Sequence, residues 1–83
     1  MEIRFAKNII KDIKKLDSKV QTRIMKKLLW FARQNDPLNF ADFLTDSEIG
    51  RYRFRIGDYR VIFDFENDII KINLVGHRRD IYK

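Results

Sequence analysis

The chain of 83 residues contains no cysteine, one histidine, one proline and three glycines. The absence of cysteine excludes a disulfide framework and a thiolate metal site, and one histidine cannot supply a site built from several imidazoles. No apolar run approaches the length of a membrane-spanning helix, and the N-terminal residues lack the apolar core of a signal peptide. We therefore expect a cytoplasmic protein that contacts no membrane and holds no metal.

Hydrophobic residues make up 45% of the chain, which suffices for one modest core and no second domain. We therefore expect a single domain over residues 1–83. Eighteen Lys and Arg residues against twelve Asp and Glu residues give a net charge of +6. This balance predicts a polyanionic or acidic partner. For the lysine-rich N-terminal half, a solvated helix face is the competing interpretation.

The first half of the sequence has a helical period and the second half has the period of a strand. A short strand at residues 3–5 precedes two apolar patterns of helical spacing, over 9–16 and from residue 18 to near residue 35. The segment 39–48 has no clear period, and we expect a loop with at most one helical turn, in which Phe40, Phe43 and Leu44 are buried. With the strands described next, the pattern predicts an α+β fold: a small antiparallel sheet of about four strands with two N-terminal helices on one face.

From residue 51 onward apolar and polar side chains alternate. In residues 51–56 the apolar side chains take one face of a strand and three arginines take the other. Gly57 and Asp58 suit a two-residue hairpin turn, because glycine tolerates a positive φ. The turn fixes the register of the two strands that it joins.

That register places Arg55 directly opposite Arg60 on the outer face. Like charges facing each other across a strand pair cost up to about 1 kcal/mol. We interpret the pair, which Arg53 extends, as an anion site. The alternative is that Asp58, Asp64 or solvent screens the guanidiniums.

A further apolar strand runs over residues 69–75 after a turn at 66–68. Strict alternation places Leu74 on the core face. Because this strand runs antiparallel to the one before it, its end lies beside Tyr59 and Arg60. The residues that follow should emerge close to the arginine pair.

The last seven residues, His77-Arg78-Arg79-Asp80-Ile81-Tyr82-Lys83, supply an imidazole, two guanidiniums and a phenol. Such groups bind a phosphate and move its protons, as metal-free RNA cleavage requires. We expect His77 and Arg78 to converge with Arg55 and Arg60 on one end of the exposed sheet face.

The stretches Tyr52–Phe63 and Val75–Tyr82 resemble the RelE/ParE toxins of bacterial and archaeal toxin-antitoxin systems, and the resemblance covers the whole chain in order and size. It implies a RelE-like microbial ribonuclease-type fold. In the RelE branch it further implies an endoribonuclease that cuts mRNA in the ribosomal A site, without metal or other cofactor, and so inhibits translation. ParE-like relatives act on DNA gyrase, so a gyrase inhibitor without nuclease activity is the alternative. An inactive member that only binds its antitoxin is a third possibility.

The resemblance also implies residue roles and partners. Arg60 stabilises charge on the scissile phosphate, Arg78 protonates or neutralises the leaving 5′ oxygen, and Tyr82 is the general base, with His77 as another candidate base. Four side chains are expected to bind RNA: Arg53, Arg55, His77 and Arg79. The first two replace lysines of RelE and cannot act as the base, because arginine keeps its proton. The implied partners are a RelB-like antitoxin, the ribosome and mRNA, with DNA reached only through the antitoxin complex.

Overall fold

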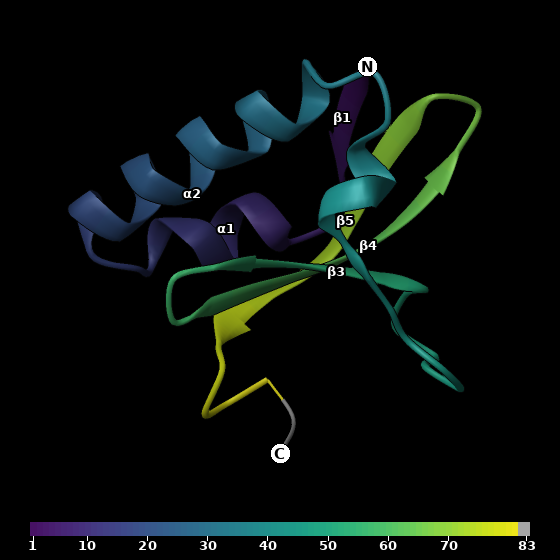
Figure 1. The fold of residues 1–83 in the computed structure, drawn as a ribbon. Coiled ribbons are helices and arrows are strands. Elements are labelled where there is room, and N and C mark those ends of the chain that lie inside the picture. The colour runs from purple at the N-terminus through teal and green to yellow at the C-terminus, as the bar shows by residue number, and fades with distance from the viewer. Residues whose placement is uncertain (82–83) are drawn as a thin grey trace.

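The computed structural model describes residues 1–81 of the chain, and two helices cover one face of a five-stranded sheet of order β1-β5-β4-β3-β2 (Figure 1). The elements are β1 (Glu2–Phe5), α1 (Ile9–Lys14), α2 (Ser18–Ala32), the 3-10 helix η1 (Pro37–Phe40), β2 (Asp42–Phe43), β3 (Tyr52–Ile56), β4 (Tyr59–Glu66) and β5 (Ile69–His77). Neither helix within residues 1–81 has the length and apolar character needed to cross a bilayer.

The α+β class and the packing of both helices on one face are confirmed, and two details of the sheet differ from the expectation. The sheet is mixed rather than antiparallel throughout, because β1 runs parallel to β5, with Ile3 opposite Ile70. It also contains a fifth strand, β2, which pairs with β3. A strand of two residues is too short to show an alternation of apolar and polar side chains, so the sequence pattern did not predict it.

A stack of three aromatic rings joins α2 to the centre of the sheet. The ring of Phe31 in α2 lies 3.9 Å from that of Phe54 in β3, at an angle of 9°. Phe54 in turn lies 4.2 Å from Phe63 in β4. Phe54 and Phe63 have no exposed surface and Phe31 is 3% exposed. Rings of this size dominate the burial energy of a small core, so this stack holds the helix layer on the sheet.

The segment after α2 differs most from the expectation. The helix ends at Ala32, earlier than expected, and η1 follows. Phe40 and Phe43 are 47% and 66% exposed, so the expectation that they are buried is wrong. Phe43 lies in the edge strand β2 opposite Tyr52 of β3, and its only ring contact among the described residues is an edge contact with that of Tyr52.

The hairpin of β3 and β4 has the predicted register. Arg55 lies opposite Arg60, and the apolar residues of both strands meet on the other face. Gly57 has a φ of 58°, the conformation that a two-residue turn of type II′ requires at its first central position. The alternation of the sequence therefore separates a face packed against the helices from an outer face that carries arginine.

A β-bulge in β5 overturns the expectation for Leu74. Phe63 pairs with Ile72 and Ile62 pairs with Leu74, so Asn73 is an extra residue between two partners. Leu74 consequently lies on the outer face beside Ile62, and Val75 takes the core position at 9% exposed. From the bulge onward each side chain of β5 points to the face opposite to that predicted.

The bulge is held by a side-chain network on the outer face. The amide Nδ2 of Asn73 donates to the carbonyl of Ile49 at 2.8 Å and to Oδ2 of Asp64 at 3.0 Å, and the backbone N–H of Arg51 donates to Oδ1 of Asp64 at 3.0 Å. These bonds tie the loop before β3 to the sheet. A Cβ at Gly50 would lie 2.9 Å from the carbonyl oxygen of Phe63, so the loop approaches the sheet as closely as glycine permits.

Replacing Phe54 with alanine should lower the free energy of unfolding by about 3–5 kcal/mol, because the change removes the middle ring of the buried stack and leaves a cavity. Urea denaturation followed by circular dichroism measures the loss. Phe43→Ala, which truncates a ring that is 66% exposed, is the matched control and should change the free energy by less than about 1 kcal/mol. Similar losses in the two variants would refute the assignment of the stack as the centre of the core.

Candidate functional site

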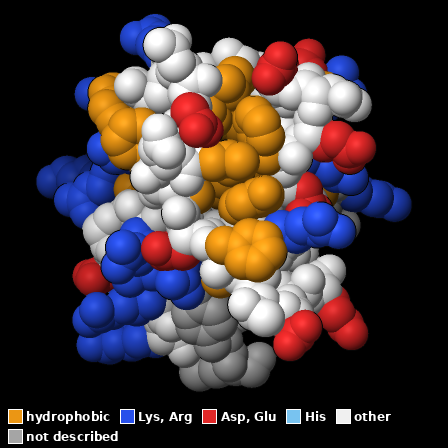
Figure 2. Space-filling view, turned by 45° about the vertical axis from the view of Figure 1, so that its right-hand side comes forward, with side chains coloured by type: hydrophobic (Ala, Val, Ile, Leu, Met, Phe, Trp, Pro, Cys, Tyr) orange, Lys and Arg blue, Asp and Glu red, His pale blue; other side chains and the backbone are white. Residues whose placement is uncertain are grey.

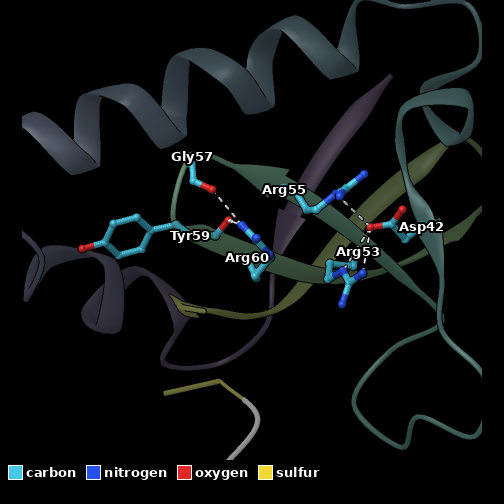
Figure 3. Close-up of polar contacts among 6 residues, drawn as sticks. All are labelled: Asp42, Arg53, Arg55, Gly57, Tyr59 and Arg60. Carbon is cyan, nitrogen blue, oxygen red and sulfur yellow. Dashed lines mark hydrogen bonds and ion pairs between the residues drawn. The ribbon is translucent and has the colours of Figure 1, made fainter. Parts of the chain in front are cut away.

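Three arginines share the outer face of the β3–β4 hairpin, which we call the arginine face: Arg53, Arg55 and Arg60. Arg53 and Arg55 are alternate residues of β3, and Arg60 faces Arg55 from β4 (Figure 3). The pleat of the sheet sends all three side chains away from the helices. The structure therefore brings together the three arginines of the hairpin that the sequence placed on one face.

Arg60 is held over the hairpin turn by neutral acceptors. Its Nη1 donates to the carbonyl of Gly57 at 2.8 Å and to the carbonyl of Tyr59 at 2.9 Å (Figure 3). Among residues 1–81, no carboxylate forms an ion pair with Arg60. The guanidinium thus has a defined position while its charge is left uncompensated by an acidic neighbour.

Arg53 and Arg55 share one carboxylate, that of Asp42 in β2. Nε and Nη2 of Arg53 lie 3.1 and 2.9 Å from Oδ2 of Asp42, and Nε of Arg55 lies 3.2 Å from the same oxygen (Figure 3). The side chain of Asp42 is 33% exposed. The sequence analysis considered Asp58 and Asp64 as screening groups and missed Asp42, because only the pairing of the two-residue strand β2 with β3 places it there.

Arg78 lies at the same end of the sheet as Arg60. Its backbone N–H donates to the carbonyl of Asp58 at 2.8 Å, and its Nε lies 3.7 Å from Oδ1 of Asp58. The expectation that the chain after β5 emerges beside the hairpin turn is thus confirmed. Both side chains of the ion pair are more than half exposed, so solvent reaches the guanidinium.

His77 does not join the arginines. It pairs with Tyr59, and the two rings form an edge contact with centroids 5.3 Å apart on the face that carries the helices. The bulge at Asn73 is the cause, because the extra residue reverses which face each later side chain of β5 points to. The expected convergence of four groups on one face is therefore wrong for His77.

The imidazole of His77 has a local structural contact. Its Nδ1 accepts a hydrogen bond from the backbone N–H of Arg79 at 3.1 Å. The backbone carbonyl of His77 accepts the N–H groups of Asp80 and Ile81 at 2.9 and 3.0 Å. These bonds bend the chain into a turn, and Ile81 packs on the sheet 3.8 Å from the position that a Cβ on Gly76 would take. The turn leaves the side chain of Arg79 exposed. Tyr82 lies outside the described residues.

A basic groove runs between α2 and the tip of the hairpin. The wall from α2 carries four basic residues: Lys19, Arg23, Lys26 and Lys27. Residues 55–57 at the tip of the hairpin line the opposite side. Nζ of Lys27 lies 4.3 Å from the ring centroid of Trp30, within the range of a cation–π contact. No acidic residue lines this groove within the described part of the chain.

Hydrophobic side chains form a band on one surface of the molecule, with Lys and Arg on both sides of it (Figure 2). Large exposed side chains near η1 and β2 include Trp30 at 41%, Phe40 at 47% and Phe43 at 66%. The rings of Trp30 and Phe40 are in edge contact at 5.0 Å. These rings give the molecule exposed apolar surface beside its cationic residues.

The site offers cations rather than metal ligands. Within residues 1–81, no group of three or more His, Asp or Glu side chains is placed to hold a metal ion. Arginine side chains present planar sets of N–H donors that match the oxygens of a phosphate. The chemistry that the described side chains can perform is therefore the binding of phosphate and the stabilisation of negative charge.

Comparisons by sequence identify relatives along almost the whole chain. The profile of the ParE toxin of type II toxin-antitoxin systems, parDE, matches residues 3–82. Toxin RelE3 of Methanocaldococcus jannaschii is 31% identical over 85 residues, an alignment that spans 99% of this chain and 96% of that protein.

Two solved structures of antitoxin-toxin complexes contain a chain of similar fold. One is the RelB-RelE complex from Methanococcus jannaschii, with a TM-score of 0.70, 28% identity, and coverage of 95% of this chain and 94% of that one. The other is the RelBE2 complex from Mycobacterium tuberculosis, with a TM-score of 0.75, 22% identity, and coverage of 95% and 92%. The second likeness concerns the fold alone. The family profile and the sequence relative together show that this chain belongs to the RelE/ParE family of toxins of type II toxin-antitoxin systems.

Proposed function

We propose that this toxin is a ribosome-dependent endoribonuclease, which cuts mRNA in the ribosomal A site and so inhibits translation. The observation that supports the proposal most is the position of Arg55, Arg60 and Arg78 at one end of the sheet, around the hairpin turn. A chain of phosphates that crosses this end would meet three guanidiniums. The name of the relative, Toxin RelE3, also favours the RelE branch over the ParE branch.

The reaction that fits such a site is attack by a 2′ oxygen of RNA on its own 3′ phosphate. The bond from the 2′ oxygen to phosphorus forms and the bond from phosphorus to the 5′ oxygen breaks, which leaves a 2′,3′-cyclic phosphate and a 5′ hydroxyl. A base takes the 2′ proton, and the departing 5′ oxygen receives one. Negative charge accumulates on the other phosphate oxygens, where fixed cations lower the barrier.

In this proposal Arg60 stabilises the charge that accumulates on the phosphate, and Arg78 neutralises the leaving 5′ oxygen. Arginine keeps its proton, so the proton for the 5′ oxygen comes from water or from a group of the ribosome. Tyr82 is the general base. An isolated tyrosine has a pKa of about 10, so it acts as a base at neutral pH only where nearby cations favour the phenolate.

The position of His77 supports this division of roles. Its ring lies against Tyr59 on the helix face, and its Nδ1 is occupied by the backbone N–H of Arg79. A base must come within hydrogen-bonding reach of the proton that it removes. Since His77 and the arginine face lie on opposite sides of the sheet, we do not assign His77 as the base; His77 and Arg79 keep the RNA-binding role that the resemblance implies.

We further propose that residues 1–83 act as one domain in the cytoplasm and that a RelB-like antitoxin inhibits the toxin. The exposed rings of Trp30, Phe40 and Phe43 suit an apolar helix or strand of such a partner. The lysines of α2 suit the backbone phosphates of ribosomal RNA, which they would contact without reading sequence. DNA would be reached only through the antitoxin.

Inhibition of DNA gyrase is the second candidate, because the family profile that matches the chain is that of ParE. This function would require a protein surface and no nuclease chemistry. A supercoiling assay with purified gyrase separates the two proposals. Blocked supercoiling together with intact mRNA on ribosomes would favour the ParE-like function and refute the nuclease.

Arg60→Ala should lower the rate of mRNA cleavage on purified ribosomes by about 100- to 1000-fold, the usual cost of removing one donor that stabilises the transition state. Primer extension on the ribosome-bound mRNA measures the rate. Arg33→Ala removes the same charge from an exposed position at the end of α2 and should cleave at the rate of the unmodified protein. Arg60→Lys keeps the charge but lacks the planar set of N–H donors, so its cleavage rate should lie between those of the two alanine variants. Equal rates for Arg60→Ala and Arg33→Ala would exclude the proposed role.

Arg78→Ala should abolish both cleavage and growth arrest, whereas Asp58→Asn should retain them. Asp58→Asn removes the exposed ion pair at 3.7 Å but keeps the backbone bond from the N–H of Arg78 to the carbonyl of residue 58. Exposed ion pairs contribute little to stability, so this variant tests the pair alone. Primer extension and growth after induction of each variant give the two readouts. Loss of activity in Asp58→Asn at unchanged stability would show that the ion pair, rather than contact of Arg78 with RNA, is what matters.

A further inference from the structure

One oxygen of Asp42 accepts two hydrogen bonds from Arg53 and also forms an ion pair with Arg55. Nη2 and Nε of Arg53 lie 2.9 and 3.1 Å from Oδ2, and Nε of Arg55 lies 3.2 Å from it (Figure 3). The pairing of Asp42 with Arg53 between β2 and β3 sets this geometry. The carboxylate is therefore held on the arginine face by the backbone.

An oxygen of a carboxylate and an oxygen of a phosphate are equivalent acceptors for a guanidinium, which binds both through the same N–H donors. Asp42 consequently occupies donors that an RNA phosphate would need. The ion pair with Arg55 is open to solvent, since the side chain of Asp42 is 33% exposed and that of Arg55 is 64% exposed, whereas the side chain of Arg53 is 24% exposed. A phosphate can reach the arginines without any rearrangement of the core.

The three arginines of the face differ in whether a carboxylate of the chain already contacts them. Arg60 donates to the neutral carbonyls of Gly57 and Tyr59, and within residues 1–81 it has no acidic partner. Arg53 and Arg55 both contact an anion that belongs to the chain. A phosphate at Arg60 meets no competitor among the described residues, whereas a phosphate at Arg53 or Arg55 must displace or share Asp42.

We propose that Asp42 acts as an internal competitor of phosphate and sets the affinity of the arginine face for RNA. The carboxylate lowers the affinity of Arg53 and Arg55 for any phosphate, so the arginine face by itself binds free RNA poorly. A phosphate that is positioned independently, as on the ribosome, displaces the carboxylate. The identity of the polyanion as RNA rests on the proposed function, whereas the competition itself does not.

Asp42→Asn removes the charge of the competitor and keeps its size. The probe is a short single-stranded oligoribonucleotide with 2′-O-methyl groups, which cannot undergo 2′ attack, and fluorescence anisotropy over a range of salt concentrations gives its affinity. Asp46→Asn is the matched control, because it makes the same change of net charge in the same segment, at an exposed residue that forms none of these ion pairs. Asp42→Glu keeps the charge and serves as a second reference.

Asp42→Asn should bind the probe about three- to tenfold more tightly than Asp46→Asn at physiological salt, because the carboxylate no longer competes with phosphate for Arg55 and for the two donors of Arg53 that it accepts. The slope of log affinity against log salt should steepen by about 0.7 for each additional phosphate contacted by a single strand. Asp42→Glu should bind like the unmodified protein. Truncation of Arg55 to alanine should weaken binding more in the Asp42→Asn background than in the unmodified chain.

Two results would overturn the proposal. Equal affinities and slopes for Asp42→Asn and Asp46→Asn would show that only net charge matters. Weaker binding by Asp42→Asn, at an unchanged thermal transition, would show that the carboxylate orients the arginines for phosphate instead of competing with it.

Primer extension on ribosomes separates this inference from the proposed function. If the unmodified protein cleaves mRNA but Asp42→Asn binds the probe no more tightly than Asp46→Asn, the competition is refuted and the nuclease proposal stands. The affinity shift without cleavage would refute the nuclease and leave the competition established.

Discussion

The register of the β3–β4 hairpin is the constraint on which the site depends. Once Gly57 adopts its positive φ, each residue of β3 has a fixed partner in β4, and the pleat assigns every side chain to one of two faces. Phe54 then lies in the aromatic stack under α2, while its neighbour Arg55 faces Arg60 on the other side. The same alternation that builds the core therefore builds the cationic face, and a slip of one residue would destroy both.

Two segments outside the hairpin cover its outer face: the loop before β3 buries an apolar side chain there, and β2 supplies a carboxylate to the arginines. The loop before β3 packs on the sheet through Gly50 and leaves Ile62 only 2% exposed. Asp42 reaches Arg53 and Arg55 from the edge strand. A row of arginines that would repel one another in isolation is thereby stabilised, and Arg55 keeps 64% of its side chain exposed.

The bulge at Asn73 reverses the face to which the later side chains of β5 point. It turns Leu74 to the outer face, and three residues later it turns His77 toward Tyr59. The backbone of Arg78 still meets the hairpin turn, because the path of the strand is set by pairing and is insensitive to which face a side chain takes. An imidazole and a guanidinium that are adjacent in sequence consequently have different surroundings.

The sequence by itself determined the fold class, the two helices, the hairpin with its Arg55–Arg60 pair, and the meeting of β5 with the start of β4. These follow from local period and from a turn whose residues permit one register, so short stretches contain the information. Only the tertiary structure decided the strand β2, the bulge and the exposure of Phe43. A two-residue strand has no period, and the bulge depends on bonds between Asn73 and groups 9 and 24 residues away. Contacts over such separations leave no local pattern, which is why the carboxylate of Asp42 and the orientation of His77 could be read only from the folded chain.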